Sequence, residues 1–195
     1  MKKIVSVALI VLLFCAFAAE PRKHDGLYVR ILAGMGTGYA KYEDLFELYG
    51  AAGLFSFHIG GAVSENLILF GKVSSSSMTD PDVTFFGTVT GETNDTTYDV
   101  SGIGAGVNYY LPYNFYISGS VDFPVASLKS GGSEGSSDVG FGGELSLGKE
   151  WWVSDSWGLG LAVTGQFSGM KDKDEFEDNH IGNTFIGLMF SATYN

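Results

Sequence analysis

The sequence is poor in cysteine, in basic residues and in long apolar runs, and each shortage excludes a class of protein. Cys15 is the single cysteine among 195 residues, so a disulfide framework is excluded. Lys and Arg number 11 against 22 Asp and Glu, which gives a formal net charge of -11. This acidic balance argues against a nucleic-acid partner, because attraction to phosphates needs clustered basic residues.

The only long apolar run stands at the N-terminus. Two lysines precede an apolar stretch of 14 residues, and "AFA" at 16–18 supplies the small residues that a signal peptidase needs. The stretch is shorter than the roughly 20 residues of a membrane-spanning helix, so residues 1–19 are predicted to be a cleaved signal peptide rather than an anchor. Cys15 follows Phe14, where a lipoprotein signal needs a small residue. The remaining residues, 20–195, are predicted to form one domain without a transmembrane helix.

Apolar and polar residues alternate along almost all of this domain, and a helical period is nearly absent. In "TFIGLMFSATYN" near the C-terminus, Ile186, Leu188 and Phe190 share one face of a strand, and small or polar residues share the other. Most of the runs have 12–15 residues, more than the about 9–11 that a tilted strand needs to cross a bilayer. Eight strands are predicted, at 27–40, 49–62, 67–78, 97–111, 115–128, 137–151, 157–170 and 181–194.

The connections between these strands alternate in length. Short turns are predicted at 64–66, 112–114 and 154–156, and longer polar stretches such as "KSGGSEGSS" and "KDKDEFEDNH" lie between them. Short connections on one side and long ones on the other are typical of an up-and-down transmembrane barrel with periplasmic turns and extracellular loops. The predicted fold is therefore all-β: an eight-stranded antiparallel transmembrane β-barrel. A soluble lipocalin-like barrel is the rival, but it would place its large apolar residues inside.

This pattern, with "SENLILFGK", "GIGAGVNYYLPYNFYISGSV" and "GKEWWVSDSWGLG" around the short turns, resembles small bacterial outer-membrane barrel proteins of the OmpA-transmembrane-domain, OmpX and OmpW type. The resemblance spans the mature chain and is architectural. It implies residence in the outer membrane of a Gram-negative bacterium, contact with its lipids and lipopolysaccharide, and insertion by the barrel-assembly machinery. One departure is that Tyr194 is penultimate and Asn195 is last, whereas such barrels usually end on an aromatic residue.

The predicted barrel turns its apolar face outward and its polar face into a narrow lumen. We expect the inward charges to pair, because isolated buried charges are costly. The distance of each residue from the short turns pairs Lys72 with Asp122 and Arg30 with Glu150. The network either plugs the barrel or gates a pore, and the plug is favoured because eight-stranded interiors are filled by side chains. The predicted lumen residues are Arg30, His58, Lys72, Asp122, Glu144, Glu150 and Gln166.

Aromatic residues gather around the predicted short turns. Tryptophan and tyrosine favour the boundary between hydrocarbon and water, where the ring lies in lipid and its polar group meets head groups. By parity, Trp152 is expected to close the periplasmic mouth beside Glu150, whereas Trp151 and Trp157 face lipid. The predicted interface girdle is Trp151, Trp152, Trp157, Tyr109, Tyr113, Tyr116 and Tyr194.

Other sites have weak support. The three histidines lack zinc-ligand spacing, and the glycine-rich "GMGTGY" and "GIGAGV" lie within strands, so no metal or cofactor site is expected. A lipid hydrolase could be assembled only from His180, Asp178 and Ser76 or Ser77, whose spacing is not that of a triad. Acidic loops could bind Ca²⁺ or Mg²⁺ weakly, with solvated loops as the default.

We therefore predict a non-enzymatic outer-membrane protein with a structural or surface-interaction role, whose loops could meet an extracellular ligand. The alternative is a narrow pore, or a transporter that releases small or apolar molecules through an opening in the wall. A hydrolase is the enzyme alternative.

Overall fold

The computed structural model describes residues 24, 26–43, 45–85, 88–171 and 180–195. The predicted signal peptide, residues 1–19, and the acidic run at 172–178 lie outside these residues. Of the described segments, none is a helix that is long and apolar enough to cross a membrane.

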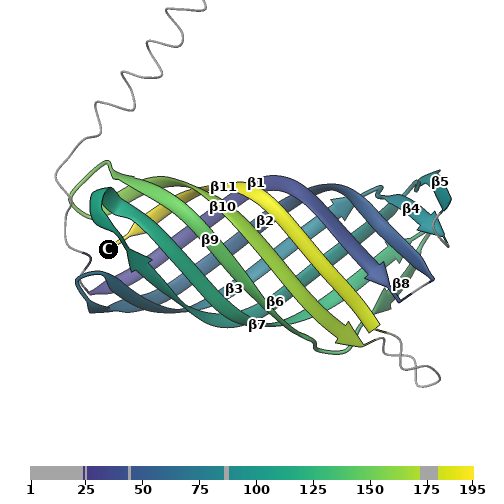
Figure 1. The fold of residues 1–195 in the computed structure, drawn as a ribbon, viewed down its shortest axis with the longest axis horizontal. Helices are drawn as coiled ribbons and strands as arrows, with labels where there is room; N and C mark the ends of the chain where they lie inside the picture. The colour runs from purple at the N-terminus through teal and green to yellow at the C-terminus, as the bar shows by residue number, and fades with distance from the viewer. Residues whose placement is uncertain (1–23, 25, 44, 86–87, 172–179) are drawn as a thin grey trace, which may run out of the picture.

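Eight long strands make up the body of the molecule (Figure 1). Each begins and ends within a few residues of its predicted range, because the alternation that defines a strand stops at the polar turns. They are β1 (Leu27–Tyr42), β2 (Phe46–Ser64), β3 (Leu67–Thr79), β6 (Thr96–Tyr110), β7 (Phe115–Ser130), β9 (Phe141–Trp152), β10 (Trp157–Lys171) and β11 (His180–Tyr194).

The strands close into a barrel. Every long strand pairs antiparallel with its sequence neighbour, and β1 pairs with β2 on one edge and with β11 on the other. Figure 1 shows the long strands wrapping at a steep tilt around one axis, with the C-terminus at one end of the barrel. The predicted eight-stranded up-and-down barrel is confirmed.

The two ends of the barrel differ. At the end that holds the C-terminus, the connections are the two-residue turn 65–66, the one-turn 3-10 helix η1 (Pro112–Asn114) and the turn 153–156, as predicted. We call this the short-turn end. At the opposite, long-loop end, the hairpin of β4 (Asp82–Phe85) and β5 (Thr88–Glu92) extends the sheet beside β2, and β8 (Ser133–Ser136) extends β7.

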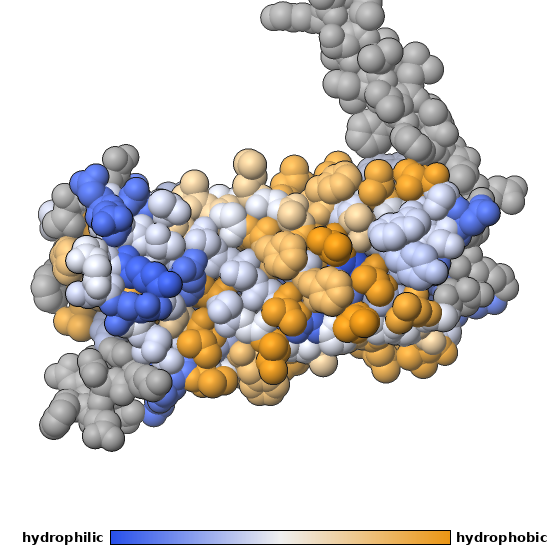
Figure 2. Space-filling view, turned by 180° about the vertical axis from the view of Figure 1, so that it is seen from behind, coloured by the Kyte–Doolittle hydropathy of each residue, from blue (hydrophilic) through white to orange (hydrophobic). Residues whose placement is uncertain are grey.

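Alternation places the apolar residues on the outer wall. Along β11, Ile186, Leu188 and Phe190 are 53, 56 and 52 % exposed, whereas Met189 between them and Ser191 after them are buried. Figure 2 shows such hydrophobic residues spread over the middle of the barrel, with hydrophilic residues towards the long-loop end. A soluble barrel has its large apolar residues inside and polar residues outside. The opposite distribution found here excludes the lipocalin-like alternative.

Glycine lets β1 and β11 approach closely where the barrel closes. A Cβ at Gly36 would overlap with the carbonyl oxygen of Ile186 and the Cα of Gly187 in β11. These contacts are with backbone, which cannot rotate away as a side chain can. By contrast, a Cβ at Gly53 on β2 would meet no atom within 4 Å.

Replacing Gly36 by valine should therefore prevent closure, because the added side chain forces β1 and β11 apart. We expect a large loss of the folded form, measured as the fraction of refolded protein that shows a gel shift on boiling. Gly53→Val is the matched control and should refold like the unchanged chain. Equal folding of the two variants would show that the close approach is not needed.

Candidate functional site

The lumen near the short-turn end is filled by a polar cluster around Arg30, on β1. The guanidinium donates to Glu150 at 2.7 Å, to the hydroxyl of Tyr110 at 2.7 Å, to Thr193 at 3.0 Å and to Asn108 at 3.3 Å. Tyr110 in turn donates to the second oxygen of Glu150 at 2.8 Å, and Thr193 also donates to Glu150. We call these five residues the Arg30 cluster.

Arg30 is fully buried and its charge is met from several sides. The ion pair with Glu150 is the predicted one, and its two side chains are 0 and 3 % exposed. The guanidinium carbon also lies 4.2 Å from the centre of the Tyr116 ring, a cation–π distance. A buried charge of this kind is tolerated only when its partners are in place, so the stability of the barrel depends on these contacts.

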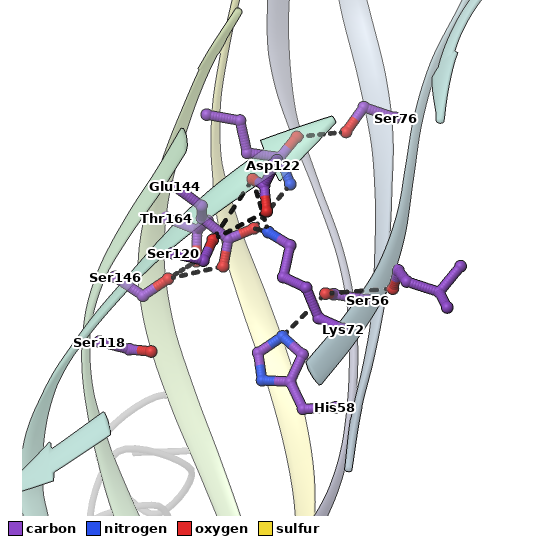
Figure 3. Close-up of polar contacts among 12 residues, drawn as sticks. Ser56, His58, Lys72, Ser76, Ser118, Ser120, Asp122, Glu144, Ser146 and Thr164 are labelled. Carbon is purple, nitrogen blue, oxygen red and sulfur yellow. Dashed lines mark hydrogen bonds and ion pairs between the residues drawn. The ribbon is translucent and has the colours of Figure 1, made fainter. Parts of the chain in front are cut away.

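A second cluster lies among β3, β7, β9 and β10 (Figure 3). Lys72 makes the predicted ion pair with Asp122 at 3.0 Å and a second one with Glu144 at 2.9 Å. Gln166 donates to Glu144 at 2.9 Å, and Ser146 donates to its other oxygen at 3.4 Å. We call these five residues the Lys72 cluster; in it one buried cation faces two carboxylates.

All seven predicted lumen residues point inward. His58 lies between the two clusters, where its ring stacks on Phe70 with centroids 4.3 Å apart and its Nε2 is 2.9 Å from the hydroxyl of Ser56. The pairing of Glu144 with Lys72 was not predicted. Lys72 and Glu144 lie on strands that are not neighbours, and only the stagger of the barrel brings them to one height.

The prediction that Tyr116 belongs to the outer girdle is wrong. Its side chain is 1 % exposed and lies under Arg30 inside the barrel. The alternation of β7 already required this, since Phe115 and Ile117 beside it are exposed. Tyr110, Asn108 and Thr193 were missed as lumen residues, although the same alternation signals each of them.

Five girdle residues do lie on the outer surface, near the short-turn end: Tyr109, Tyr113, Trp151, Trp157 and Tyr194. The rings of Trp157 and Tyr194 pack edge to face at 5.5 Å. Trp151 is half-buried on the same surface. Trp152 is buried and faces the lumen entrance, where parity placed it, so it contributes no ring to the outer girdle.

His24, which precedes β1, enters the lumen at the short-turn end. Its ring stacks on Tyr110 with centroids 3.4 Å apart and lies 5.3 Å from Trp152. Burial lowers the pKa of His24 from 6.5 to about 4; nearby Glu150 opposes the shift and Arg30 adds to it. The imidazole is therefore neutral at pH 7. It covers the Arg30 cluster at the short-turn end by stacking on Tyr110.

The lumen towards the long-loop end is mainly apolar, whereas a polar lumen was predicted. Buried residues such as Met78, Phe185 and Met189 fill it above the Lys72 cluster. It opens into a cavity of about 130 Å³. The cavity is lined mainly by Ala40, Tyr42, Phe46, Tyr98, Leu128 and Ile181.

The other candidate sites gain no support from the geometry. Ser76 donates to Gln166 inside the lumen, whereas His180 is exposed at the long-loop rim with Nδ1 3.7 Å from Glu43. Asp178 lies outside the described residues, so the hydrolase triad is not assembled by its described members. Within the described ranges, no group of three His, Cys, Asp or Glu residues is placed to hold a metal ion.

Removing the charge of Glu150 should destabilise the barrel strongly. Glu150→Gln leaves the buried Arg30 without its counter-charge, which costs about 3–5 kcal/mol in comparable buried pairs. The midpoint of urea unfolding in lipid vesicles should fall accordingly. The control is Glu134→Gln, which breaks an exposed ion pair with Lys129 and should cost about 0–1 kcal/mol. Similar losses in both variants would contradict the role of the Arg30 cluster.

Acid should release His24 from the lumen. Its pKa is about 4 when seated and 6.5 when free, so the free state binds more protons between these values. Seating is therefore strongest above pH 6.5 and weakens, by up to about tenfold per pH unit, as the pH falls towards 4. The fluorescence of Trp152, in a variant whose other tryptophans are phenylalanine, should shift to the red in this range. With His24→Gln the shift should be absent; if it persists, His24 is not its cause.

Comparison with known proteins gives a likeness of fold alone. No protein-family model and no curated protein matches the chain. Neisserial surface protein A matches with a TM-score of 0.51 and 15% identity over 86% of this chain and 98% of that chain. OprG from Pseudomonas aeruginosa has a TM-score of 0.47 and 9% identity over 89% and 98%. Ail from Yersinia pestis has a TM-score of 0.46 and 11% identity over 87% and 99%. With its closed sheet and apolar outer wall, the chain has the fold of the small β-barrels of the bacterial outer membrane.

Proposed function

We propose that this barrel is a non-catalytic protein of the outer membrane, with a structural or surface-interaction role and a plugged lumen. The observation that carries the proposal is the filling of the lumen by two ionic clusters. Arg30 and Lys72 are both buried; Arg30 pairs with one carboxylate from another strand, and Lys72 pairs with two. The rings of Tyr110, Tyr116 and His24 close what remains of the short-turn end.

The orientation follows from the connections. Outer-membrane barrels keep their short turns in the periplasm and their longer loops outside the cell. The long-loop end then carries the acidic residues Glu43, Asp80, Asp82, Asp95 and Asp138. In this proposal the end meets lipopolysaccharide and, through its hairpin β4–β5, an extracellular ligand. The barrel-assembly machinery is the proposed partner during insertion.

One observation favours a second candidate, the uptake of small apolar molecules. The cavity at the long-loop end is lined by aromatic and aliphatic side chains, and its 130 Å³ is close to the volume of apolar cavities that bind single aromatic rings. Any passage from it to the periplasm is blocked by the two clusters, so a molecule entering here would have to leave through the wall. This obstacle makes the plugged, non-transporting role the better supported one.

Conductance in planar bilayers tests the plug. The purified protein should give no reproducible current, because charged side chains fill the lumen at two levels. A variant with Lys72, Asp122 and Glu144 all replaced by alanine should show more frequent opening, whereas Lys129→Ala at the exposed rim should stay silent. Steady current steps from the unchanged protein would contradict the proposal and favour the pore.

A further inference from the structure

Lys149 is a charged residue on a part of the outer wall whose other residues are mostly apolar. It lies on the outward face of β9, where its neighbours along the strand are Leu147 and Trp151. Its partners across the sheet are Phe115 on β7 and Leu161 on β10. A lysine facing hydrocarbon is costly unless its ammonium group reaches the head-group layer, so this position requires an explanation.

The ammonium group is held by aromatic rings rather than by a protein carboxylate. Its Nζ lies 4.3 Å from the centre of the Phe115 ring and 5.7 Å from that of Trp151. Among the described residues, no carboxylate forms a salt bridge with Lys149 within 4.0 Å. The cation–π contacts steer the group while leaving its charge unneutralised.

A groove in the outer wall runs beside this lysine. Its volume is about 460 Å³, and its floor is the strand backbone at Gly148 and Ala162, whose own side-chain positions face the lumen. It crosses β7, β9, β10 and β11, and Lys149 lies three residues before Trp152, the last residue of β9 at the short-turn end. The groove's other lining is mostly outward and apolar: Leu111, Phe115, Ile117, Leu147, Leu161, Val163 and Leu188.

We propose that this groove binds one anionic glycerophospholipid of the periplasmic leaflet. Its phosphate pairs with Lys149, and one acyl chain lies in the apolar groove. A lipid is the occupant because the wall faces the bilayer, and the unneutralised ammonium group selects an anionic head group. The short-turn end is periplasmic in outer-membrane barrels, which places the site at the inner leaflet. The inference rests on the barrel's place in the membrane and is independent of whether the lumen is plugged.

Native mass spectrometry of the intact, folded protein tests the site. The protein is equilibrated in detergent with equal amounts of phosphatidylglycerol and phosphatidylcholine, which share acyl chains and a phosphate but differ in net charge. We expect one phosphatidylglycerol to be retained in preference. Lys149→Gln should lower its retention by about fivefold, the change that corresponds to about 1 kcal/mol for one basic residue near a lipid surface.

Two further variants separate this site from general lipid contact. Lys129→Gln removes an equal charge at the long-loop rim and should retain phosphatidylglycerol like the unchanged protein. Leu161→Trp fills the groove and should lower retention while leaving Lys149 in place. The gel shift on boiling confirms that each variant is folded.

The proposal is overturned if Lys149→Gln retains as much phosphatidylglycerol as the unchanged protein, or if phosphatidylcholine is retained equally. It also fails if Leu161→Trp has no effect. Retention of lipopolysaccharide at the site in preference to phospholipid, in a mixture that contains both, would assign the groove to a different lipid and overturn it too.

Discussion

The pairing of β1 with β11 is the interaction on which the rest of the structure depends. Lipid offers no hydrogen-bond partner, so a sheet in a membrane must satisfy its two edge strands against each other. The close approach of Gly36 to Gly187 allows this seam to form. Closure with eight strands then sets a narrow diameter and leaves an interior that side chains must fill.

Closure also reverses the usual distribution of polarity. The outer wall takes the apolar residues, and the lumen receives charges that a soluble core would rarely hold. Arg30 and Lys72 are tolerated because each has carboxylate partners within about 3 Å. The lumen is not uniform, however: it is ionic near the short turns and in its middle, and apolar towards the long loops. The two ionic clusters and the apolar cavity are thus two parts of one interior.

The outer wall carries information as well. Most of its residues need only be apolar, since they meet fluid hydrocarbon. Lys149 is an exception, and the proposed binding of an anionic lipid in the groove beside it would explain why a charged residue lies there. In the proposals made above, the filled lumen blocks passage and this part of the wall binds an anionic lipid.

The period-2 alternation predicted the eight strands and the inward direction of Arg30, Lys72 and Glu150, and together with the alternating short and long connections it predicted the closed fold. This worked because a strand in a membrane barrel has a single polar face. Whether a residue occupies an odd or an even position along the strand therefore decides whether it faces the lumen or the lipid. Where parity was set aside in favour of residue type, as for Tyr116, the prediction was wrong. The height of a residue above the turns also predicted two ion pairs, since the turns provide a common reference level.

Only the tertiary structure decided the other contacts among the inward residues. Glu144 joins Lys72 across the lumen, Tyr110 bridges Arg30 and Glu150, and His24 folds back into the barrel from the chain before β1. The groove beside Lys149 is likewise shared by four strands. The sequence determines the side on which each residue lies, but contacts between distant strands depend on the stagger and curvature of the closed sheet, which no local pattern encodes.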